Sequence, residues 1–65
     1  MQKVRMIKSQ APDEIPNGSI GVVVGGDITR PGLAFVRFKR KWFGKIWAFV
    51  YPNEVELIEE ATDGH

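Results

Sequence analysis

The chain has 65 residues, a net charge of +1, no cysteine and a single histidine at its last position. This length supports one small domain, and the residue types exclude disulfides and argue against a zinc site as a supplement to its core. Hydrophobic residues make up 43% of the chain, which favours a folded domain, and no apolar run approaches the roughly 20 residues that span a bilayer.

The first predicted strand covers about residues 2–8, where Val4 and Met6 alternate with Lys3 and Arg5. Because charged and apolar residues alternate here, the N-terminus does not resemble a signal peptide. We therefore expect a soluble, cytoplasmic protein with no membrane partner.

Residues 9–18 contain Pro12, Pro16 and a final Asn-Gly pair, which predicts a long loop ending in a tight turn. Residues 20–24 form the second predicted strand, and their continuous apolar run predicts burial on both faces. Gly and Pro residues at 25–32 bracket the next loop.

Two strands with clean alternation follow. In residues 33–39, one face carries Ala34, Val36 and Phe38, and the other carries Leu33, Phe35, Arg37 and Lys39. Residues 45–50 place Ile46, Ala48 and Val50 on one face, and Trp47 and Phe49 on the opposite face. The two strands are expected to form a hairpin.

A single tight turn at 51–54 and a short closing strand at 55–58 complete the predicted elements. No segment shows a helical apolar period over ten or more residues, so no long helix is expected. The chain is thus predicted to be all-β, with one five-stranded domain over residues 1–59 and a flexible acidic C-terminal tail over residues 60–65.

Four segments make the chain resemble the SH3-like barrels. They are Val4-x-Met6, Gly18-Ser-Ile-Gly21-Val-Val, Phe35-Val-Arg-Phe38 and Val50-x-Pro52-Asn53-Glu54-Val55-x-Leu57-Ile58-Glu59. The resemblance spans about residues 3–59 and is nearest to the electron-transport accessory group, which includes the ferredoxin-docking subunit of photosystem I and the variable subunit of ferredoxin–thioredoxin reductase. Translation-type KOW barrels share Gly18 to Val23 more loosely. The resemblance implies a five-stranded SH3-like barrel and, as one hypothesis, a docking role.

No catalytic site, metal site or cofactor is expected. The chain has no cysteine nucleophile and no internal histidine to act as a base, and Ser19 is better explained as a turn hydroxyl. Carboxylates such as Asp13 and Glu14 stand next to each other in a loop, where they are usually only solvated. An enzyme is therefore not predicted.

Basic residues are concentrated before position 46, so residues 1–53 hold nine basic and three acidic side chains, a net of +6. In the predicted hairpin these cations alternate with aromatic rings, a combination that binds phosphates and stacks on bases. The candidate binding residues are Phe35, Arg37, Lys39, Arg40, Lys41, Trp42, Phe43, Lys45 and Trp47.

Three interpretations of this hairpin stay open. It binds nucleic acid, single-stranded or without sequence preference; it docks an acidic protein within a larger complex, such as one for electron transfer; or Trp47 and Phe49 are buried in a homo-oligomer. The plainer alternative is that the aromatics complete the core and the lysines are only solvated. Loop 9–18 is a second candidate, because Asp13 and Glu14 would suit a basic partner, although a proline-stiffened connection is the plainer and favoured explanation.

Overall fold

The computed structural model describes residues 2–40 and 44–60. Its elements are β1 (Gln2–Met6), β2 (Ile20–Gly25), β3 (Ala34–Lys39), β4 (Lys45–Val50), the short 3-10 helix η1 (Pro52–Glu54) and β5 (Val55–Glu60). Across these described ranges no helix is long and apolar enough to cross a membrane.

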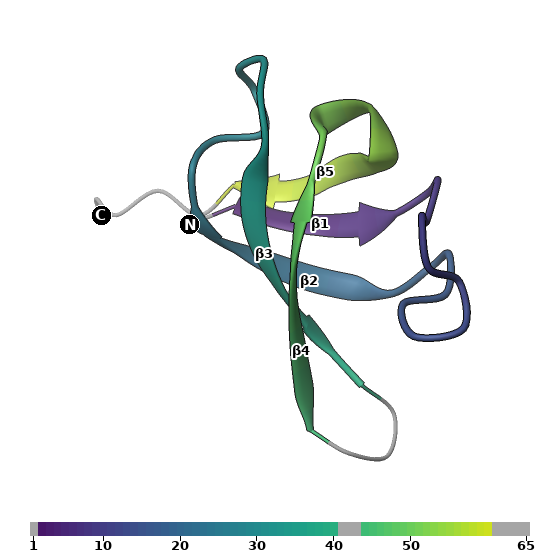
Figure 1. Ribbon diagram of the computed structural model, residues 1–65. Coiled ribbons are helices and arrows are strands. Elements are labelled where there is room, and N and C mark those ends of the chain that lie inside the picture. The colour runs from purple at the N-terminus through teal and green to yellow at the C-terminus, as the bar shows by residue number, and fades with distance from the viewer. Residues whose placement is uncertain (1, 41–43, 61–65) are drawn as a thin grey trace.

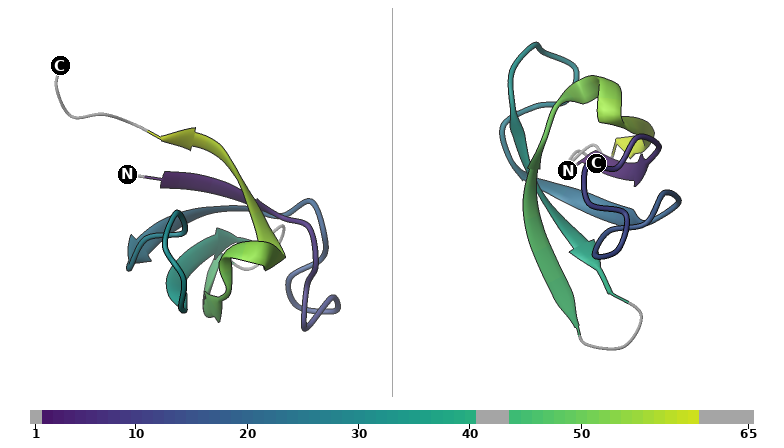
Figure 2. Two further views of the ribbon diagram at one scale, coloured as in Figure 1. Left: turned by 90° about the horizontal axis from the view of Figure 1, so that it is seen from above. Right: turned by 45° about the vertical axis from the view of Figure 1, so that its right-hand side comes forward.

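All five strands join in one antiparallel sheet with the order β4-β3-β2-β1-β5. The sheet twists strongly, so that β3 and β4 run steeply across the direction of β1 and β5 (Figures 1 and 2). Since β4 and β5 are its two edges, the sheet is not closed into a barrel. The all-β prediction is confirmed; closure into a barrel is not seen.

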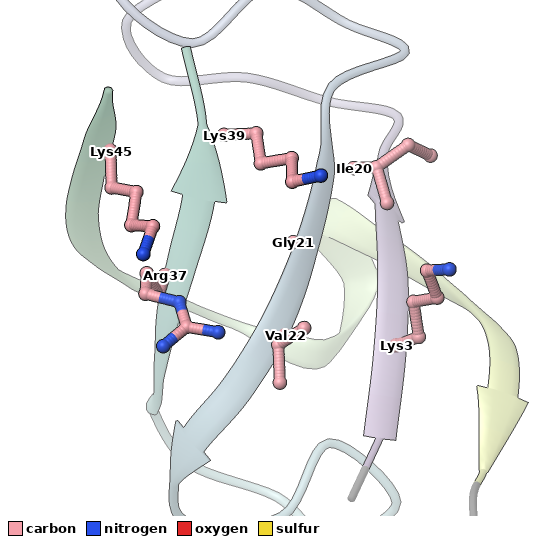
Figure 3. Close-up of a pocket in the computed structure, with 7 residues that line it drawn as sticks. All are labelled: Lys3, Ile20, Gly21, Val22, Arg37, Lys39 and Lys45. Atoms are coloured by element: carbon pink, nitrogen blue, oxygen red, sulfur yellow. The ribbon is translucent and has the colours of Figure 1, made fainter. Parts of the chain in front are cut away.

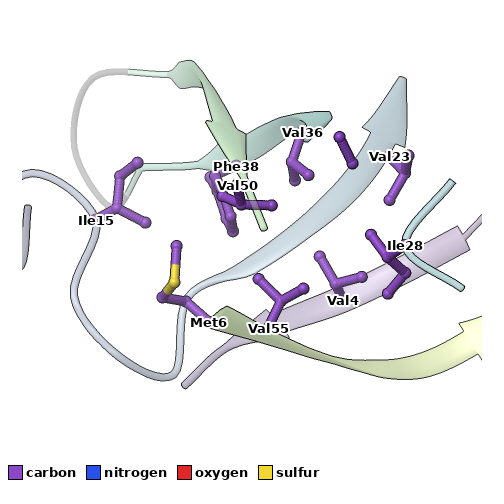
Figure 4. Close-up of a cluster of buried hydrophobic side chains, with 10 residues drawn as sticks. Val4, Met6, Ile15, Val23, Ile28, Val36, Phe38, Val50 and Val55 are labelled. Atoms are coloured by element: carbon purple, nitrogen blue, oxygen red, sulfur yellow. The ribbon is translucent and has the colours of Figure 1, made fainter. Parts of the chain in front are cut away.

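The concave side of the sheet holds the core. Alternate residues of each strand point inward, as the period-two pattern requires. Figure 4 shows this cluster, which consists of Val4, Met6, Ile15, Val23, Ile28, Ala34, Val36, Phe38, Val50 and Val55. Phe38, Val4 and Val36 are its largest fully buried side chains, and Ile46 and Ala48 pack against it.

Gly21 of β2 leaves space for two core side chains of β3. A Cβ placed on Gly21 would lie 2.7 Å from both Phe38 Cδ1 and Val36 Cγ1, which is too close for real atoms. Because both neighbours are fully buried, neither has room to retreat. A side chain at this position would therefore force these two core residues to shift.

The structure corrects three of the predicted elements. The second strand is buried on one face only, because its outward residues include Val24, which is 44% exposed. The first strand ends at Met6, before the predicted 8, since the amides of Ile7 and Lys8 instead donate to the carbonyl of Glu54. The last strand continues to Glu60, so it includes the first residue assigned to the tail; residues 61–65 lie outside the described residues.

Two loops contribute to the core from its ends. Loop 9–18 supplies Ile15, which is buried, and the loop after β2 supplies Ile28. The loop after β2 is held by Gln2. The Oε1 atom of Gln2 accepts from the Ile28 amide, and its Nε2 donates to Asp27 Oδ1 at 2.8 Å. The start of β1 is thereby tied to a loop that is distant in sequence.

The turn into β5 depends on one buried carboxylate. Glu54 is 6% exposed, and its Oε1 accepts from the Tyr51 amide while its Oε2 accepts from Gln10 Nε2. These two bonds satisfy a group that would be costly to bury alone. They hold the predicted tight turn at 51–54, which contains η1, against loop 9–18.

Candidate nucleic-acid interface

Three successive cross-strand pairs occupy the outer face of the β3–β4 hairpin, which is the face opposite the core. Starting from the hairpin tip, they are Lys39 with Lys45, Arg37 with Trp47, and Phe35 with Phe49. These six residues are called the hairpin surface below. Each residue points outward because its strand neighbours Val36, Phe38 and Val50 point into the core. The surface thus changes from cationic at the tip to aromatic at the other end.

The aromatic side chains of the hairpin surface are available to a ligand. Trp47 is 52% exposed and Phe49 is 66% exposed, whereas Phe35 is half-buried. The rings of Phe35 and Phe49 lie 4.7 Å apart between centroids at an angle of 37°. Large exposed rings on adjacent positions of one face are typical of an interaction surface.

The two halves of the sheet differ in how their cations are neutralised. On β1, the Arg5 guanidinium lies 2.7 Å from a Glu56 carboxylate oxygen, and Lys3 Nζ lies 3.9 Å from Glu59 Oε1. Within the described side chains, the cations of the hairpin surface form no such ion pair. Uncompensated positive charge is therefore concentrated on β3 and β4.

Five predicted site residues lie together on this surface: Phe35, Arg37, Lys39, Lys45 and Trp47. Arg40 is exposed at the tip, where its amide donates to the carbonyl of Gly44. The other three predicted residues, Lys41, Trp42 and Phe43, lie outside the described residues.

Some neighbours of this surface were not in the predicted site. Phe49 belongs to it by its register with Phe35, and its alternation with Val50 already placed it on this face. Lys3 lies on the same outer face of the sheet, two strands from Arg37, because β2 separates β1 from β3. The alternation of β1 indicated that Lys3 points outward, but no local pattern indicates which strands lie beside it.

Loop 9–18, the second candidate site, is anchored by its apolar residue. Ile15 is buried in the core, and its amide donates to the carbonyl of Ala11. Asp13 and Glu14 are exposed and form no ion pair with the described side chains. The loop therefore has a structural role in closing the core, and its two carboxylates face solvent.

One carboxyl group has a strongly lowered pKa, and it lies outside the hairpin surface. The pKa of Asp27 falls from 3.8 to about 2, mainly because the Thr29 hydroxyl and amide donate to its carboxylate, with a further bond from Gln2. These bonds organise the loop after β2. In the described ranges, no group of three or more His, Cys, Asp or Glu residues is arranged to hold a metal ion.

Comparison with known proteins gives no relative from which to transfer a function. No protein-family model matches the chain, and no curated protein or solved structure matches it significantly. Any functional conclusion therefore has to rest on the residues of the hairpin surface.

Proposed function

We propose that this chain is a non-catalytic nucleic-acid-binding module that contacts its ligand with the hairpin surface. The observation that carries the proposal is the set of three cross-strand pairs, which combines uncompensated cations with exposed rings on one face. When cationic side chains contact phosphates, condensed counterions are released, which favours binding. Flat aromatic rings stack on exposed bases. A surface with both properties suits a polyanion that carries planar groups.

We also propose that the rolled sheet is a variant of the SH3-like architecture. Five short strands, the long first loop and the one-turn helix η1 between β4 and β5 support this proposal. This architecture serves many kinds of binding, so it does not by itself favour nucleic acid.

Salt dependence is the first test of the proposed function. Three phosphate contacts by Arg37, Lys39 and Lys45 correspond to a slope of about −2 in log K against log salt for a single strand. The affinity for a fluorescein-labelled oligonucleotide, followed by anisotropy, should then fall roughly 20-fold between about 50 and 200 mM salt. A slope near zero would contradict phosphate contacts by this surface.

Stacking is tested by a series at Trp47, which is half-exposed and replaceable without opening the core. Trp47→Leu should weaken binding about 5- to 150-fold, the range for losing one stacked base, while Trp47→Phe should retain part of the affinity. Tyr51→Leu is the matched control, because Tyr51 is 53% exposed and lies beyond the hairpin surface. Equal effects at positions 47 and 51 would refute stacking on Trp47.

Docking of an acidic protein is a second candidate function. It is favoured by one observation, namely that β4 is an edge strand of the sheet and also carries the exposed rings. A partner strand adding to this edge would contact Trp47 and Phe49 at the same time. This function predicts that Arg37→Gln slows the association of the chain with an acidic protein. The proposed nucleic-acid function predicts that the same variant has a lower salt slope in its binding to an oligonucleotide.

A further inference from the structure

A cavity of about 290 Å³ opens on the outer face of the sheet over β2. Cations from three strands line it, namely Lys3 of β1, Arg37 and Lys39 of β3, and Lys45 of β4. Its floor includes the apolar side chains Ile20 and Val22. Figure 3 shows Lys45, Arg37 and Lys39 on one side of the cavity and Lys3 on the other side of β2.

The register of the sheet aligns this cavity with the exposed indole. Trp47 is opposite Arg37, Arg37 is opposite Val22, and Val22 is opposite Lys3. This row crosses four adjacent strands, which is about 14 Å along the sheet at one strand spacing per step. A chain lying across the strands would therefore meet the ring first and the cations next.

The cation on the far side of the cavity is loosely held. Lys3 Nζ lies 3.9 Å from Glu59 Oε1, and both side chains are about half exposed, so their attraction is weak and screened. By contrast, its neighbour Arg5 has a carboxylate oxygen of Glu56 at 2.7 Å. Of these two cations of β1, Lys3 is the one that an incoming anion can recruit from its carboxylate.

A second observation indicates that the cavity favours an anion. Lys39 and Lys45 are directly opposite each other in the ladder, and like charges in that position destabilise a sheet. A bound phosphate would relieve this repulsion while contacting both ammonium groups. The Lys39–Lys45 pair is therefore unfavourable in the free protein and becomes favourable when a phosphate binds between the two ammonium groups.

Resting on the proposed function, we infer that the ligand is a single-stranded nucleic acid that crosses the strands from β4 to β1. It places a base on Trp47 and successive backbone phosphates along the cavity, where Lys3, Arg37, Lys39 and Lys45 contact them. In a duplex the base faces are stacked on one another, so exposed rings on a sheet have no base face to contact. In the described ranges, the longest helix is the one-turn η1, which offers no recognition helix for a major groove.

The ligand class is tested with fluorescein-labelled oligothymidine of about ten nucleotides and a duplex of the same length. At equal salt the single strand should bind at least about tenfold more tightly, because only its bases can stack. A duplex that binds as tightly as the single strand would overturn this inference and leave the proposed function standing. Failure of both probes to bind would overturn the proposed function itself.

The path across the sheet is tested at Lys3. Lys3→Gln should weaken single-strand binding about 2- to 12-fold and reduce the salt slope by about 0.7, as expected for one lost phosphate contact. Lys8→Gln is the control, since Lys8 is exposed in the loop after β1 and does not line the cavity. If Lys3→Gln matches Lys8→Gln while Arg37→Gln weakens binding, the ligand stays on the hairpin and the inference is wrong.

The competing carboxylate provides a test of opposite sign. Glu59→Gln should strengthen binding, because Lys3 then no longer has to leave Glu59. Glu14→Gln removes the same charge from the exposed loop 9–18 and controls for net charge. A gain of equal size in both variants would show that Glu59 does not compete for Lys3.

Discussion

Replacing Lys45 by glutamine should stabilise the folded protein and weaken its binding to nucleic acid. Lys45 is opposite Lys39 at the end of the β3–β4 ladder, and both side chains are exposed. Glutamine keeps most of the length of lysine but removes its charge. The two effects have opposite signs because the repulsion belongs to the free protein and the phosphate contact belongs to the complex.

The size of the stabilisation follows from the register. Directly opposed side chains have Cβ atoms about 4.5–5.5 Å apart, and such pairs change the free energy of unfolding by about 0.2–1 kcal/mol. For a domain of this size, about 0.5 kcal/mol corresponds to a rise of roughly 2–4 °C in the melting temperature. Because both groups are exposed, the gain should shrink as salt is added.

A double-mutant cycle isolates this pair from other effects of the substitution. Urea unfolding of Lys39→Gln, Lys45→Gln and the double variant, at low and high salt, gives the coupling between the two positions. Either single variant should remove the repulsion, so the second substitution should add nothing at low salt. Lys8→Gln, which lowers the net charge equally, should leave stability almost unchanged.

Two results would refute this reasoning. One is a loss of stability in Lys45→Gln at low salt, which would mean that Lys45 has a favourable partner. The other is a coupling that persists unchanged at high salt, which would mean that the pair interacts through packing and not through charge. In the binding assay, an unchanged salt slope would remove Lys45 from the phosphate contacts.

Two further predictions concern the fold. Gly21→Ala should lower the free energy of unfolding by about 1–3 kcal/mol in urea denaturation, because its Cβ would meet Phe38 and Val36 at 2.7 Å. Gly25→Ala in the same strand, where the nearest atom would be at 3.4 Å, should cost much less, and equal losses would contradict the packing argument. Because the pKa of Asp27 is lowered from 3.8 to about 2 in the folded protein, the unfolded chain binds the proton first as pH falls, and this contribution to stability is present above pH 3.8 and lost toward pH 2. Unfolding curves measured across this range should show a shallower fall for Asp27→Asn than for the parent protein, and identical profiles would mean that the Thr29 and Gln2 bonds do not persist in solution.

The strands and their faces could be predicted because alternation is a local property. Successive side chains of a strand point to opposite faces, so the order of Ala34, Phe35, Val36 and Arg37 determined which residues face the core before any partner strand was known. The same rule placed Trp47 and Phe49 outward on β4. The tight turn at 51–54 also follows from its own residues, since proline and a glutamate that reaches back favour one short turn.

Burial of the loop residues was not predictable in this way. Ile15 and Ile28 are single apolar residues within polar loops, and they join the core because the fold brings their loops against the inward side chains of the sheet (Figure 4). The apolar run at 20–24 predicted burial on both faces, but five strands supply only one layer in the described structure, so Val24 remains 44% exposed. An apolar run reports the residue types and not the number of layers that surround them.

The sequence by itself determined the five strands, the inward residues and the collection of cations and rings on one hairpin. Only the tertiary structure decided which cations form ion pairs within the described residues, because β5 returns beside β1 and brings Glu56 and Glu59 to Arg5 and Lys3. The acidic segment after position 53 therefore begins as a neutralising edge strand and not as a free tail. The cavity that joins Lys3 to the hairpin has the same origin. Its residues are 42 positions apart at the extremes and meet because strand pairing depends on the complementarity of whole faces, which no local pattern encodes.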